Sequence, residues 1–357
     1  MDTVFDYLKW RGDLLFADSP LCEIDAMMLS MAVYVDLSKI CGSEDKRFAD
    51  AAAGYCADGK YDSENLGLIM PSRNINRMFC EMAKTRRFAN THISDHVANT
   101  CNYDGYQFSG TVFHLNSDSM AIVYRGTDDS IAGWREDCCL AYLDEIPSQR
   151  MAVEYLQSMA EKYPNKKIST MGHSKGGNLA LYAAIMCGDG LRDRIEHVYS
   201  LDSPGLSKKV IDSKEYAAIE SRVTVVMPQS SFIGTMFERG ERYSVVMSRV
   251  SGLWQHDPFT WTLRGPRFLK FKSLSSRGIK NEEHFRRKMD GMTGEEKRKL
   301  IEGLFGIIST TGATTLTELT RLGPKKVAAL IKTYADIDKE QREMITLLLF
   351  KLLEIKK

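Results

Sequence analysis

Residues 170–184, TMGHSKGGNLALYAA, hold one serine between two glycines. The spacing Gly172-x-Ser174-x-Gly176 is the G-x-S-x-G pattern, in which the serine lies at a sharp turn between a strand and a helix. The run before it, KKIST, is rich in strand formers, and the run after it, KGGNLALYAAIM, is rich in helix formers. Glycine suits both flanking positions because such a turn leaves no room for a Cβ atom. The stretch therefore predicts a strand, a tight elbow and a helix, with Ser174 as a candidate nucleophile.

The composition is that of an ordinary globular chain. Of 357 residues, 43% are hydrophobic and 27% charged, and 48 basic residues balance 47 acidic ones. A net charge near zero gives no global field that would attract nucleic acid, so no nucleic-acid partner is expected. Residues 1–20 contain no apolar signal-peptide core, and the apolar run 345–353 is well short of the roughly 18 residues that span a bilayer. We expect a cytoplasmic protein without a transmembrane segment.

The cysteines do not form a metal-binding pattern. There are eight of them and no C-x-x-C spacing, which argues against a zinc site. In a reducing cytosol we expect all of them to remain thiols that serve packing. They are Cys22, Cys41, Cys56, Cys80, Cys101, Cys138, Cys139 and Cys187.

Strands alternate with helices in the middle of the chain, which we assign to a catalytic core of residues 96–262. Six β-prone runs lie there, and helical segments separate the later ones. This alternation is typical of a doubly wound, mainly parallel sheet, here opened by an antiparallel hairpin at residues 105–125. The runs are GYQFSGTVFHL, MAIVYRG, KKISTMG, IEHVYSL, SRVTVVMP and RYSVVMS.

Both ends of the chain have helical patterns. Residues 1–95 form a helical lead-in, with apolar residues at helical spacing and no competing alternation. Residues 263–357 form a helical extension, in which Thr293 to Glu296 is a capping box and Gly312 ends a helix. The last stretch, residues 339–357, predicts an amphipathic closing helix. The ends are thus expected to cover one core.

A serine nucleophile needs a base, and the α/β-hydrolase order of Ser, acid, His leaves three candidates downstream. His197 lies inside a β-run and would be fixed in the sheet. His284 lies among charges in the C-terminal part. His256 lies in the loop GLWQHDPFTW after the last predicted strand, where such folds present the base. We predict His256, although a histidine in an aromatic loop can also serve packing alone. His173, inside the elbow, is expected to pack beside the nucleophile.

The acid has one leading candidate. Asp202 ends the strand IEHVYSL and opens the turn DSPG, at the edge of the sheet where a triad acid belongs. The alternative role of Asp202 is to start that turn. Asp257 adjoins His256, but a neighbour on a short loop rarely folds back to the ring. The next strand, VTVVMP, is followed by QSSFIG, which has no carboxylate.

An oxyanion site needs the N–H of the residue after the nucleophile and a second N–H from an early loop. Lys175 supplies the first. Thr127, in VYRGTDDSIAGW, supplies the second, and its hydroxyl can add to it. The alternative is a plain turn at the strand end in which Arg125 pairs with a local carboxylate.

Four blocks of this sequence resemble those of the class 3 lipases. They are YRGT (124–127), Trp134-x-x-Asp137, GHSKGGNLA (172–180) and SLDSPGLS (200–207). The N-terminal part, FDYLKWRGDLLFADSP followed by EIDAMMLSMAVYVDL, further resembles an uncharacterised bacterial branch of lipase-like serine hydrolases. The resemblance covers nearly the whole chain and implies an α/β-hydrolase fold with a mainly parallel sheet, a helical N-terminal lead-in and a helical C-terminal extension. It also implies the same serine nucleophile, base and oxyanion residues.

Two departures from the class 3 pattern matter for chemistry. Class 3 lipases take their acid from a D-x-V-P turn after the next strand, where this chain has QSSF at residues 229–232, so the acid has moved one strand earlier, to Asp202. Lys175 stands where those lipases have leucine. This lysine would put a cation near the site, which argues against a purely apolar substrate.

Two further stretches bear on the substrate. Phe232, Ile233 and Met236 fall on one predicted helical face, and Trp254 lies next to the loop histidine, as in an acyl-binding wall. An aromatic stripe of this kind is more often ordinary core. The basic stretch 263–280 could attract a phosphorylated head group, but a solvated face explains it equally simply.

The sequence as a whole predicts a serine hydrolase of carboxylic esters that works through an acyl-enzyme. The expected substrate is a small ester or acyl compound, including lipids, and neither a metal nor an organic cofactor is expected. An acyltransferase or amidase with the same triad, and a non-catalytic binding protein that keeps the elbow, remain alternatives.

Overall fold

Nine strands form the central sheet of the computed structural model, which describes residues 2–42, 44–57, 72–101, 105–238, 240, 242–276, 278–280, 283, 287, 291–323 and 342. Their order is β1-β2-β3-β4-β5-β6-β7-β8-β11. Neighbours from β4 to β8 are parallel, whereas β1 to β4 and the pair β8 and β11 are antiparallel. A separate hairpin pairs β9 with β10. The strands are β1 (Lys46–Arg47), β2 (His92–Cys101), β3 (Tyr106–His114), β4 (Ser119–Tyr124), β5 (Lys167–His173), β6 (Ile195–Leu201), β7 (Val223–Pro228), β8 (Tyr243–Val246), β9 (Leu263–Arg264), β10 (Arg267–Phe268) and β11 (Lys270–Phe271).

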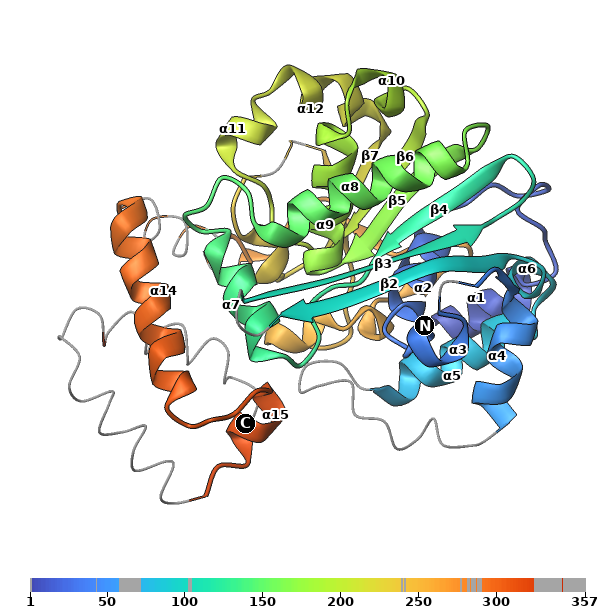
Figure 1. The fold of residues 1–357 in the computed structure, drawn as a ribbon. Helices are drawn as coiled ribbons and strands as arrows, with labels where there is room; N and C mark the ends of the chain where they lie inside the picture. The colour runs from blue at the N-terminus through green and yellow to red at the C-terminus, as the bar shows by residue number, and fades with distance from the viewer. Residues whose placement is uncertain are drawn as a thin grey trace.

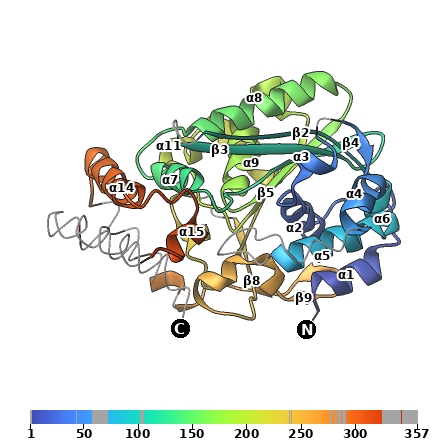
Figure 2. The same cartoon turned by 60° about the horizontal axis from the view of Figure 1, so that its bottom comes forward.

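Helices cover both faces of this sheet (Figure 1). Figure 2 shows α8 on one side of the strands and α1, α2 and α5 on the other. The N-terminal layer is α1 (Val4–Arg11), α2 (Glu23–Ala32), α3 (Leu37–Ile40), α4 (Phe48–Ala57), α5 (Ser72–Ala83) and α6 (Arg86–Ala89). The later helices are α7 (Ile131–Cys139), α8 (Pro147–Lys162), α9 (Lys175–Met186), α10 (Asp189–Arg192), α11 (Lys208–Ile211), α12 (Lys214–Ile219), α14 (Gly294–Ser309) and α15 (Leu316–Thr320). Short 3-10 turns are η2 (Glu220–Arg222), η3 (Ile233–Thr235), η4 (Gly252–His256) and η5 (Pro258–Thr260).

The alternation of side chains along the strands explains the layers. In β4, Ala121 and Val123 join the apolar cluster of the N-terminal helices. Met120, Ile122 and Tyr124 join the cluster formed with α8 and α9. Because successive side chains of a strand point to opposite faces, one buried strand serves both cores.

The structure confirms the six strands predicted between residues 105 and 248, including the antiparallel hairpin of β3 and β4. It adds β2, which the sequence analysis did not predict. β2 pairs with β3, but the register shifts between Ser94 and Val97, and Asp95 has a positive φ of 55°. This bulge and the polar residues of HISDHVANTC break the period of two that marks a strand in sequence.

The C-terminal part packs on α7, the helix that follows the Thr127 loop. Leu300, Leu304 and Phe305 of α14 form an apolar cluster with Trp134 and Tyr142. In Figure 1 α14 stands beside α7 at the edge of the sheet.

The predicted cap and helix end in this part are confirmed. Thr293 and Glu296 form the reciprocal capping box, and α14 ends before Gly312, which has a φ of 65°. The predicted closing helix at residues 339–357 lies, except for Arg342, outside the described residues.

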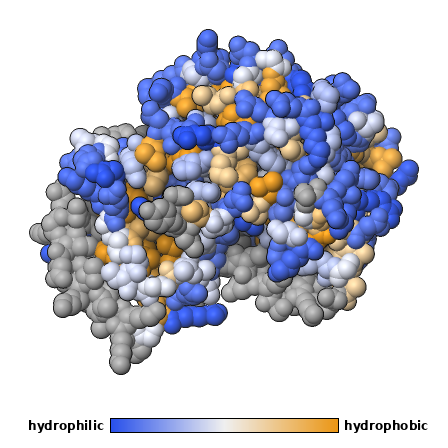
Figure 3. Space-filling model, viewed as in Figure 1, coloured by the Kyte–Doolittle hydropathy of each residue, from blue (hydrophilic) through white to orange (hydrophobic). Residues whose placement is uncertain are grey.

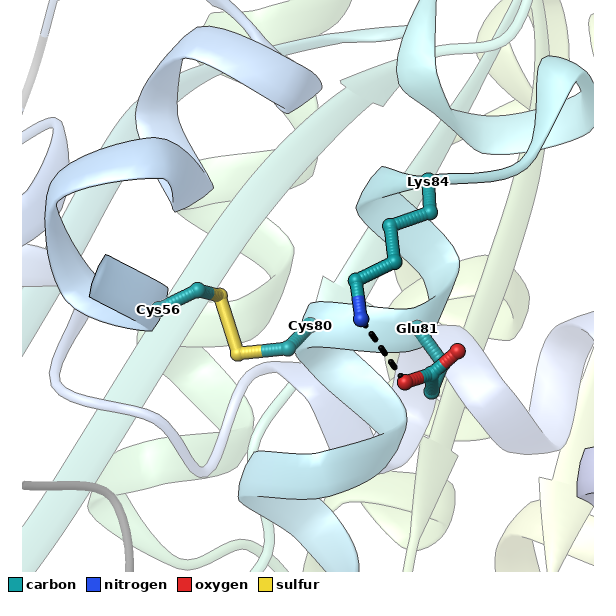
Figure 4. Close-up of a disulfide and its surroundings, with 4 residues drawn as sticks. All are labelled: Cys56, Cys80, Glu81 and Lys84. Carbon is teal, nitrogen blue, oxygen red and sulfur yellow. Dashed lines mark hydrogen bonds and ion pairs between the residues drawn. A yellow bond between two sulfur atoms is a disulfide. The ribbon is translucent and has the colours of Figure 1, made fainter. Parts of the chain in front are cut away.

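One pair of cysteines is disulfide-bonded, so the expectation of eight thiols is wrong for this pair. Cys56 of α4 and Cys80 of α5 are joined, and Figure 4 shows the bond beside the Glu81–Lys84 ion pair. Packing of α4 on α5 brings the two Cα atoms within 5.8 Å, a proximity that cysteine spacing alone does not reveal. Disulfides persist mainly in oxidising compartments. The pair therefore bears on the cytoplasmic location, which stays a prediction.

The described surface is mostly polar. On the face shown in Figure 3, hydrophilic residues dominate and hydrophobic residues gather in smaller patches between them. None of the helices within the described ranges is long and apolar enough to cross a membrane.

Candidate active site

Ser174 lies at the turn between β5 and α9, with φ 58° and ψ −134°. The two glycines of the motif make this turn possible. A Cβ atom on Gly172 would lie 2.2 Å from the Gly176 carbonyl carbon, and one on Gly176 would lie 2.2 Å from the Tyr124 carbonyl oxygen. The left-handed φ of a non-glycine residue costs free energy of about 1–3 kcal/mol, a feature that clusters at functional sites. The predicted strand, elbow and helix are thus present.

The five parallel strands bring the other candidate residues to the same edge of the sheet. Thr127 follows β4, Asp202 follows β6, and His256 lies in η4 after β8. Carboxyl ends of parallel strands meet at one edge, which is where open α/β sheets build their sites.

His256 and Asp202 are directly hydrogen-bonded. The distance from His256 Nδ1 to Asp202 Oδ2 is 2.7 Å, and both side chains are buried. Asp202 is itself held in place, since its N–H donates to the Val226 carbonyl at 2.7 Å and its φ is 43°. A carboxylate on Nδ1 keeps the proton there and leaves Nε2 as the basic nitrogen.

The turn after β7 supports this carboxylate. The Ser231 hydroxyl donates to Asp202 Oδ1 and accepts the Gly234 N–H at 2.7 Å. In this turn, where class 3 lipases carry their acid, the chain therefore supplies a hydroxyl that fixes Asp202. Sequence reasoning found the turn but not this contact.

His173 packs on the ring of His256. The two ring centroids are 4.4 Å apart, and His173 Nε2 lies 2.8 Å from the His256 carbonyl oxygen, to which it donates. Burial lowers the pKa of His173 well below its ordinary value, so this ring stays neutral. Trp261 Nε1 donates to the Gln255 carbonyl at 2.8 Å in the same loop. Both contacts fix the loop that carries His256, and His173 packs beside the elbow as predicted.

Thr127 is tied to Asp137 of α7. Its hydroxyl donates to Asp137 Oδ2 at 2.5 Å. Burial raises the pKa of Asp137 to about 6, while Lys175 acts in the opposite direction. Because this hydroxyl proton is already engaged, the backbone N–H is the group that Thr127 can offer to an oxyanion.

The side chain of Lys175 is fully buried, contrary to the expectation of a cation near the substrate. Its Nζ donates to the Gln107 carbonyl at 2.8 Å and to Glu136 Oε2 at 2.9 Å, and lies 3.8 Å from Asp137 Oδ1. Glu136 also accepts the N–H groups of Gln107 and Ser148. The ammonium is neutralised inside the fold, and only the backbone N–H of Lys175 is left for the site.

Tyr34 was not singled out by the sequence analysis, but it reaches the elbow. A Cβ atom on Gly126 would lie 2.2 Å from Tyr34 Oη, 2.5 Å from the His173 carbonyl oxygen and 3.2 Å from Ser174 Cβ. These atoms therefore surround one point, and glycine is required at position 126. A tyrosine in an apolar helical run gives no sequence signal of such a position.

The predicted substrate wall differs from its expectation. Residues 232–237 do not form one helical face, because η3 is a single turn, Met236 is extended and Phe237 has a φ of 63°. Phe232, Ile233 and Met236 are half-buried. Trp254 of η4 is 41% exposed and adjoins the histidine loop.

The remaining candidates lie elsewhere or have other partners. His197 is held in β6, where Nε2 bonds the Thr224 hydroxyl at 2.8 Å. His284 lies outside the described residues. Asp257 caps η5 by accepting the Phe259 N–H at 2.9 Å, and burial raises its pKa to about 6.

One set of side chains within the described ranges could hold a metal ion. His173, Asp202 and His256 each offer a ligand atom, and these atoms lie within 4.8 Å of one another. Asp202 and His256 are already bonded to each other, which fits a proton-transfer pair without further ligands.

No curated protein matches this sequence. Among solved structures, the chain is similar to M37 lipase, with 15% identity, coverage of 61% of this chain and 70% of that chain, and a TM-score of 0.40. It is also similar to the Rhizomucor miehei lipase propeptide complex, with 15% identity, 69% and 81% coverage, and a TM-score of 0.33. For lipase II from Rhizopus niveus the values are 11%, 66%, 84% and 0.35.

A family match covers most of the described elements. Residues 82–306 match the Mbeg1-like family, a span that runs from the end of α5 into α14. It includes Ser174, Asp202 and His256 but not Tyr34. Since the match extends over more than half of the sequence, the chain belongs to the Mbeg1-like family.

Proposed function

We propose that the chain has the α/β-hydrolase fold and hydrolyses carboxylic esters through an acyl-enzyme on Ser174. The observation that carries this proposal is the buried 2.7 Å hydrogen bond between His256 and Asp202, at the sheet edge where the serine elbow lies. A serine elbow alone could be architecture. An imidazole held in one tautomer by a carboxylate is the additional feature that general-base chemistry requires.

In the first half-reaction, Ser174 Oγ attacks the ester carbonyl carbon and gives its proton to His256 Nε2. Asp202 stabilises the imidazolium that forms, and remains a carboxylate. The tetrahedral intermediate then collapses, the bond to the alkoxy group breaks, and His256 returns the proton to the leaving alcohol. The acyl group is now esterified to the serine.

In the second half-reaction, water takes the place of the alcohol. His256 accepts a proton from the water, whose oxygen attacks the acyl carbon, and the proton then returns to Ser174 Oγ as the carboxylic acid leaves. The N–H groups of Thr127 and Lys175 bind the oxyanion in both steps, and each such donor contributes about 10²- to 10³-fold in rate.

The contacts of Lys175 favour an uncharged acyl substrate. Its ammonium is paired with Glu136 inside the fold, so the site has no free cation from this residue. The half-buried Phe232, Ile233 and Met236 and the exposed Trp254 are the apolar groups that we assign to substrate contact. We therefore propose a small ester or lipid-like acyl compound as substrate.

The test is hydrolysis of p-nitrophenyl esters of graded chain length, followed from the first turnover. An acyl-enzyme route predicts a rapid burst of nitrophenol near one equivalent, and a mass increase equal to the acyl group on the peptide that contains Ser174. Turnover without a burst, and without an acylated peptide under acid quench, for every ester of the series would contradict the proposal.

A further inference from the structure

The hydroxyl of Tyr34 is buried without a hydrogen-bond partner among the described residues. The side chain is 3% exposed. Other buried tyrosines do have partners: Tyr7 Oη donates to Asp25 at 2.8 Å, Tyr124 Oη to the Ala152 carbonyl at 2.8 Å, and Tyr155 Oη to the Asp95 carbonyl at 2.7 Å. Tyr34 therefore departs from the pattern that this fold otherwise follows.

An unpaired buried hydroxyl is unfavourable for folding, because the group loses its water and gains nothing in exchange. Phenylalanine would fill the same space without that loss. A phenol at this position thus calls for an acceptor that is present only at some stage of function. Polar groups left unpaired in a native structure are commonly found where they have a role in binding or catalysis.

The position of Tyr34 identifies that acceptor. The phenol oxygen, the His173 carbonyl oxygen and Ser174 Cβ all lie within 3.2 Å of the point where a Cβ of Gly126 would lie. Gly126 directly precedes Thr127, whose N–H we assign to the oxyanion site. The His173 carbonyl does not accept the phenol proton. The hydroxyl therefore lies between the nucleophile and an oxyanion donor.

The Tyr34 hydroxyl also keeps its proton. Burial raises the pKa of the phenol above its ordinary value, so the group is a neutral donor at any working pH. Tyr34 comes two residues after the end of α2, which packs in the same apolar cluster as Met171 of β5. A rigid helix end thus holds the donor beside the elbow.

We propose that Tyr34 is a catalytic residue, whose hydroxyl donates a hydrogen bond to the carbonyl oxygen of the substrate as negative charge develops there. This inference rests on the proposed function and adds a third donor to the N–H groups of Thr127 and Lys175. No proton is transferred by Tyr34, and the bond strengthens as the carbonyl oxygen becomes an oxyanion. Residue 34 lies outside the family match at residues 82–306, so the donor comes from the N-terminal helical layer.

The experiment compares Tyr34→Phe with the matched variant Tyr124→Phe, in ester turnover and in thermal unfolding. For Tyr34→Phe, kcat should fall by about 10- to 100-fold with little change in KM, because the bond is made mainly in the transition state. Its melting temperature should equal or exceed that of the wild type, because an unpaired hydroxyl is removed. Tyr124→Phe loses a hydrogen bond to Ala152 and should show the reverse, a lower melting temperature and near-normal kcat.

Two results would overturn the role of Tyr34. The first is a kcat of Tyr34→Phe within about twofold of the wild type. The second is a loss of activity together with a fall in melting temperature as large as that of Tyr124→Phe, which would mark a structural hydroxyl. Labelling of the wild type at Ser174 by a fluorophosphonate separates these results from a failure of the proposed function. An unlabelled wild type would refute the hydrolase, whereas a labelled one with an indifferent Tyr34→Phe would refute only the third donor.

Discussion

Replacing Asp202 by asparagine should disable the base while leaving the fold intact, and the contacts of Asp202 explain why. Oδ1 accepts the Ser231 hydroxyl, whose own oxygen accepts the Gly234 N–H. Ser231 must therefore donate to residue 202, so an asparagine would turn its carbonyl oxygen toward Ser231. Its NH₂ group would then face His256, which would have to accept at Nδ1 and carry its proton on Nε2.

A histidine in that tautomer cannot take the proton of Ser174. The expected loss in kcat near neutral pH is about 10⁴-fold, or about 5 kcal/mol in activation free energy. The assay is ester turnover, with circular dichroism and thermal unfolding to verify the fold. Asp257→Asn is the matched control, because Asp257 caps η5 through the Phe259 N–H, and its loss should cost far less.

A double variant tests the tautomer argument itself. In Asp202→Asn with Ser231→Ala, the amide is free to turn its oxygen toward His256, and part of the lost activity should return. A mild effect of Asp202→Asn with a severe effect of Asp257→Asn, both folded, would refute the assignment of the acid. Equal and mild effects would point to a Ser–His pair that works without a carboxylate.

Three further predictions concern stability. Lys175→Met should leave the buried carboxylate of Glu136 unpaired, lowering stability by about 3–5 kcal/mol and the melting temperature by roughly 4–7 °C, and adding Glu136→Gln should restore part of it. Because burial raises the pKa of Asp257 from 3.8 to about 6, its contribution is present below about pH 4 and lost as the pH rises through 6. Urea unfolding should thus show the wild type losing roughly 3 kcal/mol relative to Asp257→Asn between pH 4 and pH 7. Removal of residues 281–357 should expose the apolar face of α7 and cause aggregation or a lower melting temperature, whereas a soluble, stable and active truncation would mean an independent C-terminal module.

Much of the fold could be predicted because its signals are local. The glycines around Ser174 and the alternation along β4 both arise from short-range geometry, and the order of strands and helices followed from them. β2 was missed because a bulge between Ser94 and Val97 interrupts the period that identifies a strand. The Cys56–Cys80 bond was missed because it depends on how two helices pack, which spacing in sequence does not encode.

The candidate site divides in the same way. Asp202 and His256 were proposed from their places after strands, and the structure brings them into contact. The direction of the Lys175 side chain could not be predicted, because its partner Glu136 is 39 positions away and the pairing arises only from tertiary packing. Tyr34 was invisible for the same reason, since only the folded chain brings the end of α2 to the elbow.

Fluorophosphonate labelling followed by peptide mapping tests the central claim most directly, because the probe reacts only with an activated serine. The account predicts that the wild type is labelled at Ser174 alone, and that Ser174→Ala loses both the label and ester turnover, the latter by about a millionfold. Ser203→Ala, which removes a buried serine close to the elbow, should be labelled as the wild type is. Undiminished turnover by Ser174→Ala, or a label on any other serine, would contradict the claim.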